Sequence, residues 1–111
     1  MKETNRMTNE IDHKVYTVDE LTVLLFPVFQ GYNVKRAVLF GSYSKGNATA
    51  KSDIDILVDS GLKGLKFVGL IDDIRRSLQD KEVDVFDITH IDRGSLVEKE
   101  IRDTGVEIYA Q

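Results

Sequence analysis

Apolar residues recur at steps of three and four in the first third of the chain, as on one face of a helix. These residues are Val18, Leu21, Leu24, Leu25, Val28, Phe29 and Tyr32. Thr17 and Glu20 ahead of them have the spacing of a capping box, in which each side chain accepts a hydrogen bond from the other residue's backbone. The pattern therefore predicts a helix that begins after Thr17 and is closed by Gly31. Pro27 removes one hydrogen bond of that helix, so we expect a kink near residues 23–27 or an early end.

Three short apolar runs follow, and their length and β-branched residues favour strands over helices. They lie at residues 34–40, 53–58 and 83–88. Between the second and third runs, one helical face is formed by Phe67, Leu70, Ile71, Ile74 and Leu78. A helix of this length is sufficient to connect two neighbouring parallel strands.

The C-terminal part repeats the capping-box spacing at Ser95 and Glu98, which predicts a short last helix ended by Gly105. Residues 106–109 can then form a small edge strand. Together these elements indicate an α/β fold in which helices cover a small sheet. We expect one domain over residues 16–111, preceded by a flexible polar leader at residues 1–15.

The composition and charge of the chain exclude several classes of function. The chain has 111 residues, of which 15 are basic and 19 acidic, for a formal charge of -4. Such a balance gives no electrostatic basis for direct binding to nucleic acid or to an anionic membrane. The chain contains no cysteine, which excludes disulfides, thiolate catalysis and zinc–sulfur sites. With neither a signal peptide nor an apolar run long enough to cross a membrane, a soluble cytoplasmic protein is expected.

Three aspartates interrupt the predicted strands. Asp53 and Asp55 share one face, because side chains alternate along a strand, and their Cα atoms are expected roughly 6.5 Å apart. Asp84 interrupts the next strand, and if the two strands are neighbours all three carboxylates can converge on one point. Like charges at such distances raise one another's pKa and destabilise a fold, a conflict that a divalent cation resolves. Oxygen ligands without His or Cys favour Mg²⁺ or Mn²⁺, typically shared with substrate phosphates.

A Gly-Ser turn precedes these aspartates. Gly41 permits close approach of the backbone, and exposed N–H groups with the Ser42 hydroxyl can cradle phosphate oxygens. Lys45 can add a positive charge. The segment 43–52 allows the chain to return, so that the turn and the aspartates face the same crevice. Each feature alone is common in turns and strand ends without catalytic roles, but their combination indicates nucleotide chemistry.

The segment 40–59 resembles the G-S-x10-D-x-D signature of the DNA polymerase beta-like nucleotidyltransferase superfamily. Residues 18–110 are similar to its minimal nucleotidyltransferase (MNT) members, which are antitoxins paired with HEPN-type ribonuclease toxins. That narrower similarity rests on the segment K-E-V-D-V at 81–85 and on the pattern E-x-x-I-x-x-x-G-V-x-I-Y at 98–109.

The resemblance implies a nucleotidyltransferase fold with a small mixed sheet, and it implies a role for each residue of the signature. Gly41 and Ser42 would hold the triphosphate of ATP. Asp53 and Asp55 would bind two Mg²⁺ ions, and Asp84 would be the third catalytic carboxylate, touching a metal and assisting deprotonation of the acceptor. The reaction would transfer AMP to a hydroxyl, expected to be a Tyr, of a cognate HEPN toxin held in a hetero-oligomer.

The chain departs from the family pattern after the Gly-Ser turn. Family members commonly carry Arg at the position of Tyr43, and here Lys45 is the nearest base. Lysine offers a point charge where arginine offers a bidentate fork, so the phosphate contact would be weaker or differently built.

Two other functions are alternatives to this nucleotidyltransferase interpretation. The first is a catalytically silent antitoxin that neutralises its partner by contact alone; intact Asp53, Asp55 and Asp84 argue against it. The second is a phosphotransferase of the haloacid dehalogenase type, in which a D-x-D nucleophile also follows a strand. Leu57 stands where that motif has Thr or Val, and the chain is short for that fold.

Overall fold

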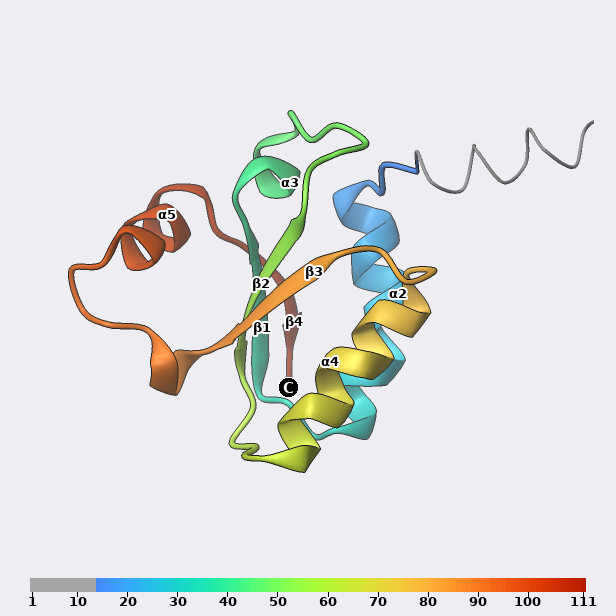
Figure 1. Ribbon diagram of the computed structural model, residues 1–111, viewed down its shortest axis with the longest axis vertical. Helices are drawn as coiled ribbons and strands as arrows, with labels where there is room; N and C mark the ends of the chain where they lie inside the picture. The colour runs from blue at the N-terminus through green and yellow to red at the C-terminus, as the bar shows by residue number, and fades with distance from the viewer. Residues whose placement is uncertain (1–13) are drawn as a thin grey trace, which may run out of the picture.

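The computed structural model describes residues 14–111, which form a sheet with helices on both faces (Figure 1). The predicted leader at 1–15 lies almost wholly outside the described residues. The elements in chain order are α2 (Val18–Gly31), β1 (Arg36–Phe40), α3 (Ser42–Lys45), β2 (Ile54–Asp59), α4 (Leu65–Ser77), β3 (Val83–Asp87), a 3-10 turn η1 (Ile88–His90), α5 (Leu96–Thr104) and β4 (Val106–Ala110).

The sheet has the strand order β3-β2-β1-β4. Strand β1 pairs antiparallel with both β2 and β4, whereas β2 pairs parallel with β3. Helix α4 supplies the crossover between the two parallel strands, as its length predicted. The predicted α/β fold with a small mixed sheet is therefore confirmed, and β4 is an edge strand as expected.

Two apolar clusters hold the sheet in place. The larger lies beneath α2 and α4, which cover one face together (Figure 1). The smaller lies on the opposite face, under α5, and consists of Val38, Phe40 and Leu57 with the partly buried Phe86, Ile91, Val97 and Ile101. Because side chains alternate along β2, Ile54, Ile56 and Val58 join the first cluster while Leu57 joins the second. Asp55 belongs to the second face, next to α5.

Helix α2 begins as the capping box predicts. The Thr17 hydroxyl accepts the Glu20 N–H at 3.0 Å, and the Glu20 carboxylate accepts the Thr17 N–H at 2.9 Å. The alternative of an early end at Pro27 is wrong, because α2 continues to Gly31. Leu25 and Phe29 are buried on either side of the exposed Pro27, and their packing against the sheet compensates for one missing hydrogen bond.

The strand bounds differ from the prediction by one or two residues. Strand β1 begins at Arg36 and not at residue 34, β2 extends to Asp59, and β3 ends at Asp87. The larger difference is α3, a short helix formed by Ser42 of the Gly-Ser turn and the first residues of the segment that was predicted only as a returning loop. Its C-terminus is closed by Gly46 in the left-handed conformation.

Asp87, at the end of β3, is a buried polar centre that the sequence analysis did not single out. It is 2% exposed and its carboxylate accepts four hydrogen bonds. Ser60 donates through its N–H at 3.1 Å and its hydroxyl at 2.6 Å, and Thr89 does the same at 3.1 and 2.6 Å. Burial raises the pKa of Asp87, but these hydrogen bonds together outweigh it and leave the pKa below its ordinary value. The carboxylate thus ties the end of β3 to the turn after β2.

Replacing Asp87 by Asn is expected to lower the free energy of unfolding by about 2–3 kcal/mol, because the amide has one acceptor oxygen where four donors converge. Urea unfolding measures the loss. Asp72→Asn, on the exposed side of α4, is the control and should change stability by less than about 0.5 kcal/mol. Equal stability of the two variants would show that the Asp87 hydrogen bonds do not stabilise the fold.

Candidate active site

The register of the sheet brings the predicted residues to one end of neighbouring strands. Asp55 lies opposite Phe40 on β1 and opposite Asp84 on β3. Asp53 directly precedes the first residue of β2. The prediction that the strands carrying Asp55 and Asp84 are neighbours is confirmed. Asp55 is thus placed between the end of β1, where the Gly-Ser turn begins, and Asp84.

The electrostatics of Asp55 reflect this crowding. Its side chain is partly buried, and its pKa is raised to about 6 by burial and then by the negative charges of Asp84, Asp53 and Glu100. Glu100 lies on α5 and was not among the candidates, because nothing in the sequence indicates which helix covers this face. Asp84, in contrast, is exposed. Three other carboxylates therefore act on Asp55 at this end of the sheet.

The carboxylates are not assembled into a ready-made metal site. Within residues 14–111 no group of three or more acidic or histidine side chains is arranged to hold a metal ion, so the convergence of Asp53, Asp55 and Asp84 on a cation stays a prediction. Without a counter-charge, close approach of these like charges is unfavourable. The all-oxygen donor set nevertheless fits Mg²⁺, which is usually held by one or two carboxylates together with substrate phosphates. The residues therefore suit an ion that arrives with a nucleotide better than a protein-only cage.

Gly41 lies against the Asp55 carboxylate. Its φ of 78° and ψ of -151° lie in a region that is essentially restricted to glycine. A Cβ atom at this position would lie 2.7 Å from Oδ2 of Asp55. The glycine thus permits the backbone to approach the Asp55 carboxylate closely, a contact that was not predicted from the sequence.

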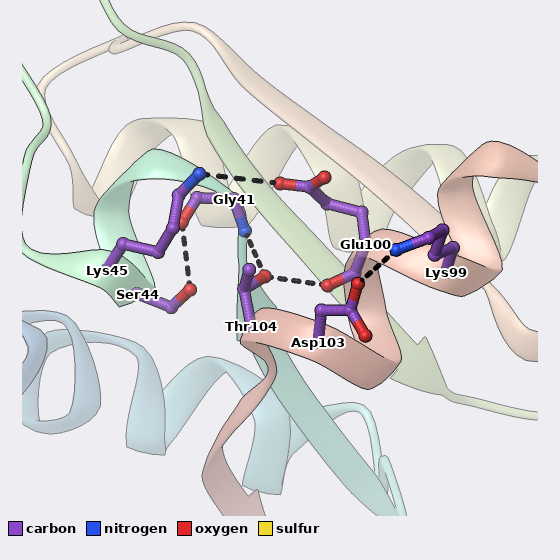
Figure 2. A network of polar contacts seen from close by, with 7 residues as sticks. All are labelled: Gly41, Ser44, Lys45, Lys99, Glu100, Asp103 and Thr104. Atoms are coloured by element: carbon purple, nitrogen blue, oxygen red, sulfur yellow. Dashed lines mark hydrogen bonds and ion pairs between the residues drawn. The ribbon is translucent and has the colours of Figure 1, made fainter.

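The Gly41 N–H, which was expected to face phosphate, is already engaged. It donates to the Thr104 hydroxyl at 2.9 Å, and Figure 2 shows this contact between the turn and α5. Ser42 is the first residue of α3 and is partly buried. The Gly41 N–H is therefore occupied in the protein alone, while Ser42 stays a predicted phosphate-binding residue.

Lys45, the third predicted nucleotide-binding residue, points across the turn toward α5 (Figure 2). Its Nζ lies 3.9 Å from a carboxylate oxygen of Glu100, and both side chains are about half exposed, at 46% and 45%. At this distance and exposure the ion pair is weak, so Lys45 can exchange it for a phosphate at small cost.

A comparison with known proteins identifies the family. The family model "Polymerase beta, Nucleotidyltransferase" matches residues 25–111, which include the turn and all three aspartates. The chain belongs to this nucleotidyltransferase family. It is also 37% identical over 71 residues to the "Putative protein adenylyltransferase MJ0435" of Methanocaldococcus jannaschii, covering 61% of this chain and 74% of that protein.

Solved structures share the fold of this nucleotidyltransferase. One is a crystal structure of a toxin-antitoxin with AMP-PNP, with a TM-score of 0.67, 22% identity and coverage of 81% of this chain and 73% of the other. Another is a tri-AMPylated Shewanella oneidensis HEPN toxin in complex with MNT antitoxin, with a TM-score of 0.63, 19% identity and coverage of 86% and 74%. The nucleotidyltransferase fold predicted from the signature is therefore shown.

Tyr43 departs from the common family pattern for a structural reason. Its side chain is 3% exposed and belongs to the larger apolar cluster. The buried Tyr43 side chain is therefore not available to a phosphate at the surface of the turn. In this nucleotidyltransferase the position after Ser42 therefore serves packing, and any phosphate contact from a cationic side chain must come from elsewhere.

Lysines beside Asp53 are candidates for such a contact, although they were not among the predicted site residues. A cavity of about 240 Å³ is lined by Asp53 and by Lys14, Lys51 and Lys81, along with two acidic side chains of the segment before β3. These lysines come from three separate segments, so no local sequence pattern could have revealed them. They provide positive charge next to one of the predicted metal ligands.

No helix within residues 14–111 has the length and apolar character needed to cross a membrane.

Proposed function

We propose that this nucleotidyltransferase transfers AMP from ATP, in the presence of Mg²⁺, to a hydroxyl of a cognate HEPN-type toxin in the cytoplasm, with Tyr as the acceptor residue. The transferase class follows from family membership. The choice of AMP and of a protein acceptor is supported by the name of the Methanocaldococcus relative and by the AMPylated toxin in the Shewanella complex.

The observation that carries the proposal is the arrangement around Asp55. One neighbour is Asp84 in the adjacent parallel strand, and the other is the backbone of Gly41, which only a glycine allows to lie so close. The turn that we propose to bind phosphate and a pair of carboxylates thus share one end of the sheet. This is the combination that nucleotidyl transfer requires, since the same phosphate must meet both the turn and the metal ligands.

The chemistry is an in-line displacement at the α-phosphorus of ATP. The acceptor oxygen forms a bond to phosphorus, the bond between the α-phosphorus and its bridging oxygen breaks, and pyrophosphate leaves. Ser42 holds the triphosphate, Asp53 and Asp55 would hold the metal, and Asp84 would assist removal of the hydroxyl proton. Mg²⁺, when bound, lowers the pKa of the attacking hydroxyl and neutralises charge on the leaving group.

The position of Asp84 explains why a partner protein suits this site. Strand β3 is an edge of the sheet, and Asp84 on it is exposed. An acceptor side chain carried by a second protein can therefore approach Asp84 from the open side. AMP added near the RNA-cleaving centre of a ribonuclease would place negative charge there and repel RNA phosphates.

Replacing Asp84 by Asn tests the proposal. We expect the rate of transfer to fall by about 10²–10⁴-fold, the usual contribution of a positioned acid or base. The measurement uses the protein with its cognate toxin, Mg²⁺ and ATP labelled at the α-phosphate, and counts label on the toxin. Asp59→Asn is the matched control, because Asp59 lies on the same face of β2 as Asp55 but at the opposite end of the strand.

Three outcomes are informative. Label on the toxin with the wild type and Asp59→Asn, but not with Asp84→Asn, supports the proposal. Undiminished transfer by Asp84→Asn contradicts the assigned role. Neutralisation of the toxin without any label, even by the wild type, contradicts the enzymatic function and leaves the antitoxin that acts by contact alone.

A further inference from the structure

The two peptide groups on either side of the Gly41 Cα are each held by a separate part of the fold. The N–H of Gly41 donates to the Thr104 hydroxyl at 2.9 Å. Its carbonyl accepts the Ser44 hydroxyl at 2.9 Å and the Lys45 N–H at 3.2 Å. The carbonyl contacts lie within the turn and α3, whereas the N–H contact comes from α5, 63 residues further along the chain. Figure 2 shows the turn between these two supports.

The Thr104 hydroxyl has a fixed direction. It donates its own proton to the carbonyl of Glu100 at 2.7 Å, the residue one turn earlier in α5. A hydroxyl has a single proton to donate, so the oxygen meets Gly41 as an acceptor. Thr104 is the last residue of α5 and is therefore tied both to its own helix and to the turn.

Close packing sets the position of α5 over the turn. A Cβ atom at Gly105 would lie 2.5 Å from the Ile101 carbonyl oxygen and 2.9 Å from Cγ1 of Val38. Glycine at this point lets the C-terminus of α5 rest on β1. Val97 and Ile101 pack on the small cluster beneath α5. The Thr104 hydroxyl is thus held next to Gly41, because α5 cannot shift without disturbing the packing of that cluster.

We propose that Thr104 is a positioning residue for nucleotide binding, an inference that rests on the proposed function. In a trans peptide the N–H points opposite to the C=O, so the Ser42 N–H points away from the donors that hold the Gly41 carbonyl. Because Ser42 is the first residue of α3, this N–H has no acceptor within the helix and is available to a phosphate. Glycine places few restrictions on its φ and ψ angles, so the peptide group before Gly41 would otherwise be free to rotate. The hydrogen bond from the Gly41 N–H to Thr104 removes this freedom. The Ser42 N–H is thereby preorganised for the triphosphate.

The test compares Thr104→Val with Thr22→Val. Thr22 lies in α2 and makes the same hydroxyl contact to a carbonyl one turn earlier, at 2.9 Å to Val18, but it accepts no N–H from the turn. For Thr104→Val we expect the dissociation constant of Mg-ATP, measured by calorimetry, to rise at least about tenfold. The KM for ATP should rise in parallel with little change in kcat, since the Ser42 contact forms in both the ground state and the transition state. In Thr104→Ser the dissociation constant and the KM should both be close to those of the wild type, because serine keeps the hydroxyl. Thr22→Val should also resemble the wild type in both values.

A second readout needs no nucleotide. In the ligand-free protein, exchange of the Gly41 amide proton with solvent should be at least about tenfold faster in Thr104→Val than in the wild type or Thr104→Ser. Thr104→Ala gives the same comparison should the valine variant fail to fold. Normal ATP binding together with unchanged amide exchange in the variant overturns this inference alone. Failure of the wild type itself to bind Mg-ATP overturns the proposed function and this inference together.

Discussion

Replacing Gly41 by Ala is expected to lower the free energy of unfolding by about 2–3 kcal/mol, because alanine is strained at this φ and ψ. The added Cβ would lie 2.7 Å from the Asp55 carboxylate, which must rotate away. That rotation removes the carboxylate from the place where a metal and phosphate would meet it, so transfer to the toxin should fall by at least about 10²-fold. Urea unfolding and label transfer from ATP measure the two effects.

Gly46→Ala is the control that separates the effect of backbone strain from the effect of a steric clash with Asp55. Gly46 also has a positive φ, of 80°, but a Cβ there meets nothing within 4 Å. The cost in unfolding free energy should be about 1 kcal/mol, the ordinary penalty for alanine in the left-handed region, and transfer should stay within about twofold of the wild type. Full activity in Gly41→Ala, or an equal loss in both variants, would show that contact between Gly41 and Asp55 does not matter for the reaction.

The parts of the site that were predictable from sequence lie within single strands or in adjacent ones. Strand periodicity predicted that Asp53 and Asp55 share a face, and a helix of suitable length between β2 and β3 made parallel neighbours the expected arrangement. From these two rules, the proximity of Asp55 and Asp84 follows without a structure. The capping box of α2 similarly depends on contacts within four residues. At α5 only half of the predicted box forms, because Ser95 accepts the Glu98 N–H at 3.1 Å while Glu98 accepts the N–H of Gly94, at 2.6 Å, and not that of Ser95.

The parts that were not predictable depend on how distant elements dock. Thr104 meets Gly41 only because α5 folds back over β1, and no residue pattern near either position encodes that contact. Glu100 and the lysines around the cavity beside Asp53 reach the site in the same way. The burial of Tyr43 is another case, since a tyrosine after the Gly-Ser turn is equally compatible with a packed or an exposed side chain. Tertiary packing, which local periodicity does not specify, decided each of these positions.

The acidic residues around Asp55 place function and stability in opposition. Apolar side chains of β2 stabilise the sheet on both faces, whereas Asp55 is a partly buried carboxylate beside two other aspartates. Such an arrangement weakens the fold in the absence of a cation and becomes favourable once one is bound. The stability that Asp55 costs the cation-free protein is thus linked to its role in the reaction. A single substitution of Asp55 should reveal both effects.

Asp55→Asn is expected to abolish transfer while making the protein more stable at neutral pH. The pKa of Asp55, about 6, lies above that of a free carboxyl, so its neutral form favours the folded state. That contribution is complete below about pH 4 and is lost as the pH rises through 6. Asparagine never ionises, so at pH 7.5 the variant should be more stable by about 1 kcal/mol, after allowance for solvent screening of a partly exposed group. Transfer should fall by at least about 10³-fold, because the amide cannot replace the carboxylate at a metal.

Melting curves between pH 4 and pH 8, recorded with EDTA and with Mg-ATP, check this prediction. With EDTA the two proteins should melt together near pH 4 and diverge above pH 6, by about 4–8 °C for a domain of this size. Mg-ATP should raise the melting temperature of the wild type and close the gap, because a ligand that binds only the folded form stabilises it, while the variant should respond little. A variant that is less stable than the wild type at pH 7.5, or one that gains as much from Mg-ATP, would mean that Asp55 is a structural residue and that the cation binds elsewhere.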